Sequence, residues 1–204
     1  MSRSADLILA SASPRRRELL ESLGLVLVIA PVDVDETVPE GEPVRDHAAR
    51  LAAEKCEAAC ARLNQPPLAV LGADTVVFLG DQILGKPADE NQAAAMLGRL
   101  AGRRHEVLTA YRIRLGERML ERVVTTSVTF RSLDVREVAA YLASGEWRGK
   151  AGAYAIQGIA GSFVTDLRGS FTNVVGLPLA EVVADLRALE ALPGYPPPAF
   201  GAGA

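Results

Sequence analysis

Metal-binding and redox residues are scarce in this sequence. Its 204 residues include two cysteines and two histidines. The cysteines, Cys56 and Cys60, lie four residues apart in a stretch with helical spacing, "RLAAEKCEAACARL". A zinc or redox centre normally brings more ligands of these types. We therefore interpret both cysteines as small packing residues of a helix in a reducing compartment.

Long apolar runs and an excess of positive charge are missing as well. No apolar run approaches the roughly 20 residues that a membrane-spanning helix needs. The first apolar stretch is too short for a signal peptide, and arginines follow it at once. The formal net charge is −3, and no basic strand rich in aromatic residues is found. These features predict a cytoplasmic protein that binds neither membranes nor nucleic acids.

The residues that are present suit one domain that contains both helices and strands. Hydrophobic residues make up 49% of the chain, enough for a sizeable core. Apolar runs typical of strands alternate with helical spacing. Strands are expected at 6–11, 25–34, 66–79, 82–84, 105–115 and 122–133, with a further short strand after the glycine-rich loop, and helices at 14–23, 44–63, 90–102, 134–145 and 178–192.

Two long strands, 105–115 and 122–133, are joined at Gly116-Glu117 and must pair antiparallel. The predicted fold class is therefore α/β, with a mixed twisted sheet flanked by helices. No internal repeat or linker divides the chain, so we expect a single domain over residues 1–192. The segment 193–204 is rich in proline and glycine and is predicted to be a flexible tail.

Three consecutive arginines stand in the stretch "SASPRRRELL", residues 11–20. Pro14 suits the first position of a helix, with Ser13 as its N-cap, so the arginines lie where a strand turns into a helix. Like charges repel, and the N–H groups at a helix start favour anions. We therefore expect an anion to bind at this point.

Asp74 lies in the middle of an apolar strand, "VLGADTVVFL". A buried acid costs several kcal/mol unless it is paired or bound to a metal. One interpretation is an aspartate bonded to backbone amides at a strand bend, helped by Gly72. The other is a site residue that orients water, acts as a general base or binds a hard cation such as magnesium. The residues alone leave both open.

Two further charged positions have two interpretations each. Glu36 follows Asp33 and Asp35 in "VDVDET", at a strand end where carboxylates often face a cleft. On the residues alone, a solvated acidic loop is the favoured interpretation. Lys55 lies on the apolar flank of its helix, either as a surface lysine with a buried stem or as a cation of the cleft.

A lysine and a glutamine stand in two other loops. "GDQILGK" matches the front of a phosphate-binding P-loop, but Pro87 follows Lys86 where a serine or threonine would hold magnesium, so we reject that motif. Lys86 still projects from a constrained Gly-Lys-Pro turn. The glycine-rich stretch 149–163 is an ordinary loop or one that passes close to a ligand. In the second case Gln157 offers a donor and an acceptor that suit a base edge.

These cations and carboxylates together point to phosphoanhydride chemistry, because cations neutralise a polyphosphate while carboxylates hold a metal and activate water. Eight motifs then follow in order between about residues 7 and 190: "ASASPRRRELL", "VDET", "RLAAEKC", "LGADTVV", "LGKP", "GRRHEVLTA", "GKAGAYAIQG" and "GSFTNVVGLPL". With them the chain resembles the Maf family of nucleotide pyrophosphatases.

The resemblance implies an elongated fold like that of inosine triphosphatase, with two lobes around a central cleft, in a homodimer. It implies hydrolysis of a nucleoside triphosphate to the monophosphate and pyrophosphate with a divalent cation, Mg, Mn or Co. Asp74 matches the proton acceptor, and Glu36 with Asp74 would hold the metal. The specificity positions of the family fall on Arg15, Thr75 and Gln157, and other polar cleft positions fall on Ser11, Glu36, Lys55 and Lys86. Beside Arg15, we also expect Arg16 to face the cleft and bind the substrate. Arg17, next on the helix, should instead pair with Glu21.

The loop sequence favours one branch of the family. "AGAYAIQG" is similar to members that act on dTTP and UTP, whereas those that act on 7-methyl-GTP tend to carry "AGSFxSEG". Phe171 departs from the tyrosine that is usual in "GSFTNVVG". The alternatives are a pyrophosphatase for 7-methyl-GTP or another modified purine nucleotide, and a nucleotide-binding regulator of cell division or septum formation.

Overall fold

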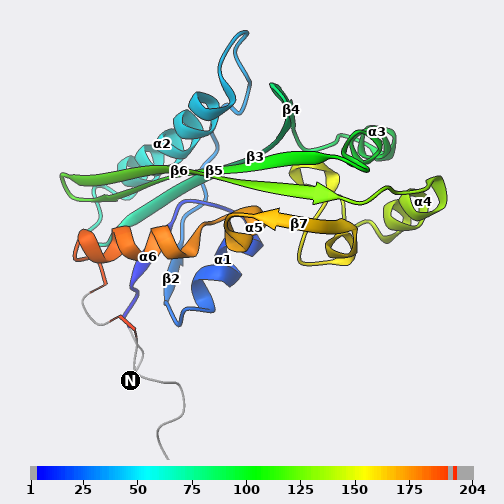
Figure 1. The fold of residues 1–204 in the computed structure, drawn as a ribbon. Coiled ribbons are helices and arrows are strands. Elements are labelled where there is room, and N and C mark those ends of the chain that lie inside the picture. The colour runs from blue at the N-terminus through cyan, green and yellow to red at the C-terminus, as the bar shows by residue number, and fades with distance from the viewer. Residues whose placement is uncertain (1–3, 193–194, 197–204) are drawn as a thin grey trace, which may run out of the picture.

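The computed structural model describes residues 4–192 and 195–196, and these form one seven-stranded sheet. The strand order is β2-β1-β3-β5-β6-β7, with β4 paired to β3 outside this path (Figure 1). β1 is parallel to β2 and β3, and the other pairs are antiparallel. The strands are β1 (Leu7–Leu9), β2 (Leu27–Ile29), β3 (Val70–Leu79), β4 (Gln82–Leu84), β5 (Arg104–Leu115), β6 (Arg118–Phe130) and β7 (Val164–Arg168).

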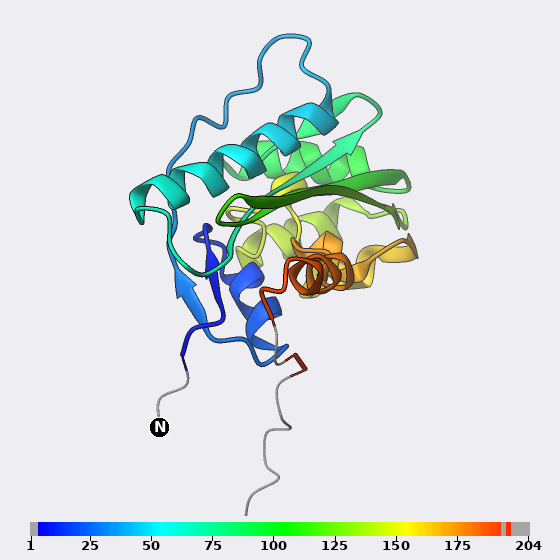
Figure 2. The ribbon, with the colours of Figure 1, turned by 90° about the vertical axis from the view of Figure 1, so that its left-hand side faces the viewer.

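Helices cover both faces of this mixed sheet, as predicted. α2 runs along one face, while α1, α5 and α6 lie on the other (Figure 1, Figure 2). α3 and α4 gather at the far end of the sheet (Figure 1). The helices are α1 (Pro14–Glu21), α2 (Val44–Arg62), α3 (Glu90–Leu100), α4 (Val135–Ser144), α5 (Phe171–Val175) and α6 (Leu179–Ala188), with the 3-10 turns η1 (Ala151–Ala153) and η2 (Ile159–Phe163).

The alternation of β3 divides its side chains between the two faces. Val77 belongs to the larger core, which it shares with residues of α1, α3, α4 and α6. Val76 packs instead on the small residues of α2. Because successive side chains of a strand point to opposite faces, Asp74 is directed to the side of α2 and Thr75 to the side of α1.

The middle of β3 has an open edge. On this side β1 pairs with Val70 and Leu71, and β4 pairs with the segment Val77–Leu79. Within the part of the chain that the structure describes, no strand pairs with residues 72–76 on that side. The end of β1, the start of β4 and the middle of β3 therefore frame an opening in the sheet.

Several elements differ from the sequence predictions: β3 starts at Val70 rather than 66, and α6 ends at Ala188 rather than 192. The strand expected at 25–34 spans only Leu27–Ile29, because its partner β1 is three residues long and Pro31 cannot donate a ladder hydrogen bond. β6 starts at Arg118 rather than 122, since the tight turn at Gly116 lets its polar end pair with β5. The five-residue α5 was not predicted. None of the described helices is long and apolar enough to cross a membrane, and apart from residues 195–196 the predicted tail lies outside the described residues.

Candidate active site

A cavity of about 460 Å³ lies at this opening of the sheet. Its walls come from the segment 10–16 at the carboxyl end of β1, from α2 and β3, from the turn after β4, from the loop 149–157 and from the end of α5. Ligand sites of α/β proteins favour such strand ends. Nine lining residues are those predicted for the site: Ser11, Arg15, Arg16, Glu36, Lys55, Asp74, Thr75, Lys86 and Gln157.

Gly72 on β3 allows α2 to approach closely enough for Lys55 to reach Asp74. A Cβ atom at Gly72 would lie 2.5 Å from the backbone nitrogen of Cys56 and would also overlap the carbonyl oxygen of Ala52. Lys55, the neighbour of Cys56, donates a hydrogen bond of 2.7 Å to Oδ1 of Asp74. The close contact between helix and strand thus pairs two buried charges, as burial requires.

The ion pairs continue outward from Lys55 to the rim of the cavity. Nζ of Lys55 also donates to Oε1 of Glu36 at 2.7 Å, and Lys86 donates to Oε2 of Glu36 at 3.0 Å. Burial opposes ionisation of Glu36, but the hydrogen bonds from the two lysines outweigh it and lower the pKa of Glu36 to about 2. Lysines and carboxylates therefore alternate along one wall, and Glu36 is ionised at neutral pH.

The two carboxylates of this wall suit a divalent cation that arrives with a phosphate ligand. Glu36 and Asp74 both lie within hydrogen-bond reach of a single ammonium group, so both can approach one cation. No cluster of three or more His, Cys, Asp or Glu side chains fit for a metal occurs among the described residues. Magnesium often uses one or two carboxylates, with phosphate oxygens and water as its other ligands. The donor set therefore fits the expected cation.

Arg16 joins three segments of the opposite wall. Its Nη1 donates to Oγ of Ser11 at 3.1 Å, its Nη2 to Oγ1 of Thr75 at 2.9 Å, and its Nε to the carbonyl oxygen of Gly176 at 2.9 Å. Burial of the guanidinium lowers the pKa of Arg16. Oγ1 of Thr75 lies a further 2.9 Å from Oγ1 of Thr109 on β5. Arg16 therefore holds the start of α1 against β3 and α5.

Arg15 and Arg17, on either side of Arg16, have different surroundings. Arg15 is half-buried in the cavity wall and donates from Nε to the carbonyl oxygen of Val175 at 3.2 Å. Arg17 is exposed and pairs with Glu21 at 2.7 Å, as the helical spacing predicts. Ser13 accepts a hydrogen bond from the backbone of Arg16 and caps the helix, also as predicted.

The glycine-rich loop approaches the cavity from the side of β3 and β5. Gly152 has φ +66°, and a Cβ atom there would lie 2.9 Å from Cγ1 of Val77, so the loop needs glycine at this close approach. Tyr154 is buried and its hydroxyl lies 2.9 Å from Nε2 of His105 on β5. This contact anchors the loop three residues before Gln157, which lines the cavity and is exposed.

The structure decides between several of the open interpretations. Lys55 is a cavity residue with a buried ammonium, so the surface interpretation is wrong. Asp74 is bonded to that lysine, and it lines the cavity as a site residue would. The favoured interpretation of "VDVDET" as a solvated loop is wrong for Glu36, which lines the cavity and pairs with Lys55 and Lys86. It agrees with Asp35, which accepts hydrogen bonds from Thr37 in an exposed loop. The catalytic and binding roles stay predictions.

Some cavity residues were missed in the sequence. Lys150 lines the cavity, and so do Tyr154, Val175 and Gly176. Lys150 stands in the motif "GKAGAYAIQG", where its position between glycines was the available signal. The carbonyl oxygens of Val175 and Gly176 accept from Arg15 and Arg16, a contact between distant segments that no local pattern indicates.

The family with the description Maf-like protein matches residues 6–189 of this chain. The chain belongs to the Maf family. A dTTP/UTP pyrophosphatase of Cereibacter sphaeroides is 54% identical to this Maf protein over 93% of the chain and 97% of the relative. One of Anaeromyxobacter dehalogenans is 52% identical, over 89% of the chain and 92% of the relative. A solved dITP/XTP pyrophosphatase of Mycobacterium abscessus is 16% identical, over 91% of the chain and 96% of that structure, with a TM-score of 0.42.

Proposed function

We propose that this Maf protein hydrolyses dTTP and UTP to the nucleoside monophosphate and pyrophosphate. The observation that carries the proposal is the wall on which Lys86, Glu36, Lys55 and Asp74 alternate in charge within one cavity. The names of relatives about half identical in sequence support the pyrimidine substrates.

The triphosphate would lie along the cavity between the two walls. Its oxygens face Arg15 and the N–H groups at the start of α1 on one side, and Lys55 and Lys86 on the other. Ser11 would add a hydroxyl, and Arg16 would hold this segment in place through its contacts to Ser11 and Thr75. Fixed cations suit such a transfer, which depends mainly on positioning and charge neutralisation.

Asp74 would act as the general base. Its carboxylate takes a proton from a water that attacks the α-phosphorus, the bond from that phosphorus to the bridging oxygen breaks, and pyrophosphate leaves. Lys55 holds the carboxylate in position through the 2.7 Å hydrogen bond. A divalent cation on Glu36 and Asp74, Mg, Mn or Co, would polarise the phosphate oxygens when bound.

Gln157 would select the base. An amide side chain offers both a donor and an acceptor, which matches the paired acceptor and donor on the edge of uracil or thymine. Thr75, on the other side of β3 from Asp74, would lie close to the nucleotide. The resemblance also supports a homodimer that works in the cytoplasm, and both belong to the proposal.

One panel tests the proposal. The purified protein is incubated with the common nucleoside triphosphates and 7-methyl-GTP, each with magnesium, manganese or cobalt, and pyrophosphate release is measured. We expect the fastest release from dTTP and UTP. Preference for 7-methyl-GTP would favour the purine alternative, and nucleotide binding without any pyrophosphate release would favour the regulator of division.

A further inference from the structure

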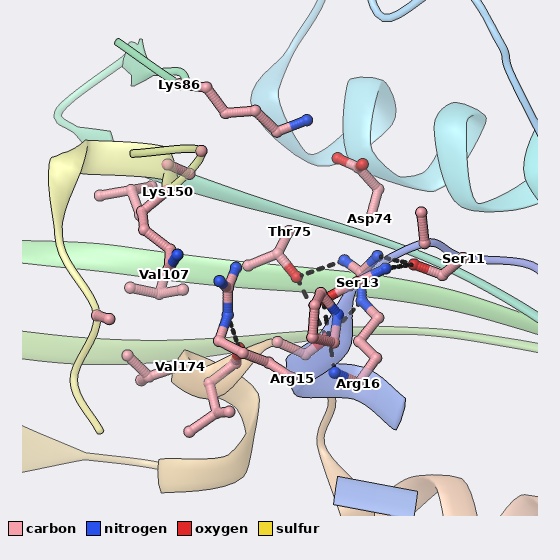
Figure 3. Close-up of a pocket in the computed structure, with 18 of the residues that line it drawn as sticks. Ser11, Ser13, Arg15, Arg16, Asp74, Thr75, Lys86, Val107, Lys150 and Val174 are labelled. Carbon is pink, nitrogen blue, oxygen red and sulfur yellow. Dashed lines mark hydrogen bonds between the residues drawn. The ribbon is translucent and has the colours of Figure 1, made fainter. Parts of the chain in front are cut away.

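Two cations of the cavity, Lys150 and Arg15, face each other. Figure 3 shows the side chains of Lys150, from the start of η1, and Arg15, from α1, directed toward one another across the cavity. The hydrogen bonds described for them go to backbone carbonyl oxygens, from Lys150 to Arg148 at 3.1 Å and from Arg15 to Val175 at 3.2 Å. Both side chains are half-buried.

This arrangement contrasts with the other lysines of the cavity. Lys55 and Lys86 are both paired with carboxylates, at 2.7 to 3.0 Å. Within residues 4–192 and 195–196, the ion pairs include no carboxylate partner for Lys150 or Arg15. The cavity therefore has one wall of ion pairs, and Lys150 and Arg15 lie together with no carboxylate of the described residues at ion-pair distance. Glu146 and Glu18 attract them only from farther away. An anion bound between Lys150 and Arg15 would be stabilised by both cations.

The charge of Lys150 is held under unfavourable conditions. Burial lowers its pKa, and the positive charge of Arg15 lowers it further, while the more distant carboxylate of Glu146 offsets part of this effect. Burial likewise lowers the pKa of Arg15. An anion placed between them would relieve both effects, because it offsets desolvation and like-charge repulsion at once.

We propose that Lys150, together with Arg15, binds the α-phosphate of the nucleotide. The inference rests on the proposed function and assigns one phosphate to one subsite. Lys150 shares the loop 149–157 with Gln157, and both line the cavity. If Gln157 contacts the base, the nearest anionic group is the α-phosphate, which the ribose joins to that base. Lys150 then neutralises charge on the phosphorus that water attacks, opposite the wall that carries Asp74.

Binding of the two reaction products distinguishes this subsite from the rest of the cavity, because UMP keeps the α-phosphate and pyrophosphate does not. Binding of UMP and of pyrophosphate is measured by calorimetry for the wild type and for Lys150→Met, Lys150→Arg and Arg148→Gln. Arg148 is an exposed cation two residues away, outside the residues that line the cavity, and serves as the matched control for loss of charge. Steady-state hydrolysis of UTP is measured on the same proteins.

For Lys150→Met we expect UMP to bind about ten- to a hundredfold more weakly, which corresponds to one lost charged hydrogen bond, and kcat/KM for UTP to fall by a similar factor. Pyrophosphate affinity should stay within about twofold, Lys150→Arg should recover most of the UMP affinity, and Arg148→Gln should resemble the wild type.

Unchanged UMP binding by Lys150→Met, in a protein whose wild type hydrolyses UTP, would overturn this inference and leave the proposed function intact. A loss of pyrophosphate affinity as large as the loss for UMP would also overturn it, because Lys150 would then hold the leaving group. A wild type that releases pyrophosphate from no nucleotide would instead remove the proposed function on which the inference stands.

Discussion

Lys55 on α2 donates a 2.7 Å hydrogen bond to Asp74 on β3, and each of the two residues is only 8% exposed. The carboxylate of Asp74 is thereby held by a cation from a neighbouring helix rather than by backbone amides at a bend of its own strand. Asp74 needs this partner, since without Lys55 it would be an uncompensated buried charge, whereas Lys55 also pairs with Glu36. The position of the proposed base is therefore a property of helix packing.

Replacement of Asp74 by asparagine should remove the base and retain the fold. The amide keeps an acceptor for Lys55, so folding should survive, while proton abstraction from water is lost. We expect kcat to fall by roughly two orders of magnitude or more. Pyrophosphate release gives the rate, and circular dichroism checks the fold. Near-normal turnover in a folded Asp74→Asn protein would exclude the base role.

Arg15 and Arg16 should respond differently to the same substitution. Arg16 makes three hydrogen bonds between α1, β3 and the end of α5, so Arg16→Met should lower the free energy of unfolding by about 3 kcal/mol. Arg15→Met should cost no more than about 1 kcal/mol in stability and act mainly on KM or kcat. Chemical denaturation of both variants tests this, and equal losses of stability would contradict the distinction.

Gln157→Glu should change which base is accepted. A carboxylate has no donor for the carbonyl oxygen of uracil, but it can accept from the N–H groups of guanine. We expect the ratio of kcat/KM for UTP to that for GTP to fall by about tenfold or more. An unchanged ratio would mean that another residue reads the base.

Metal dependence follows from the small set of carboxylates. A chelator should abolish pyrophosphate release, and magnesium, manganese or cobalt should restore it. Because the ammonium of Lys55 lies between Glu36 and Asp74, manganese alone should bind the wild type weakly, and Lys55→Met should bind it more tightly. Electron paramagnetic resonance of manganese without nucleotide measures this. Tighter manganese binding by the wild type than by Lys55→Met would contradict the idea that Lys55 and the metal ion compete for the same two carboxylates.

His105 should make the fold sensitive to mild acid. Burial lowers the pKa of His105 from 6.5 to about 4, so the unfolded chain takes up a proton at a higher pH than the folded chain. Stability should therefore be full above pH 6.5 and fall by about 3 kcal/mol as the pH approaches 4. Denaturation curves at pH 7 and 4.5 should show a smaller fall for His105→Gln than for the wild type. Equal falls in the free energy of unfolding for both proteins would show that titratable groups other than His105 cause the loss of stability in acid.

Local patterns predicted most of the helices and strands, because capping residues and apolar spacing act within a few residues. The Ser13 cap and the Arg17–Glu21 pair are examples. The sequence did not reveal that Lys55 and Asp74 touch, since helical spacing assigns Lys55 only to an apolar flank and the contact depends on how α2 packs. Lys150 was missed for a similar reason, because Arg15, the cation that it faces across the cavity, lies 135 residues earlier in the chain.

Gly72 affects the position of Lys55 relative to Asp74 as well as the packing of α2 on β3. Because Gly72 has no side chain, the backbone of α2 can contact β3 at Cys56. Cys56 is the neighbour of Lys55 on α2, and Gly72 lies two residues before Asp74 on β3. A change at this apolar position would displace the ammonium on its helix while the carboxylate stayed on its strand. The distance between Lys55 and Asp74 is thus set by the packing of α2 on β3, and a single methyl group at residue 72 would change it without altering either charged residue.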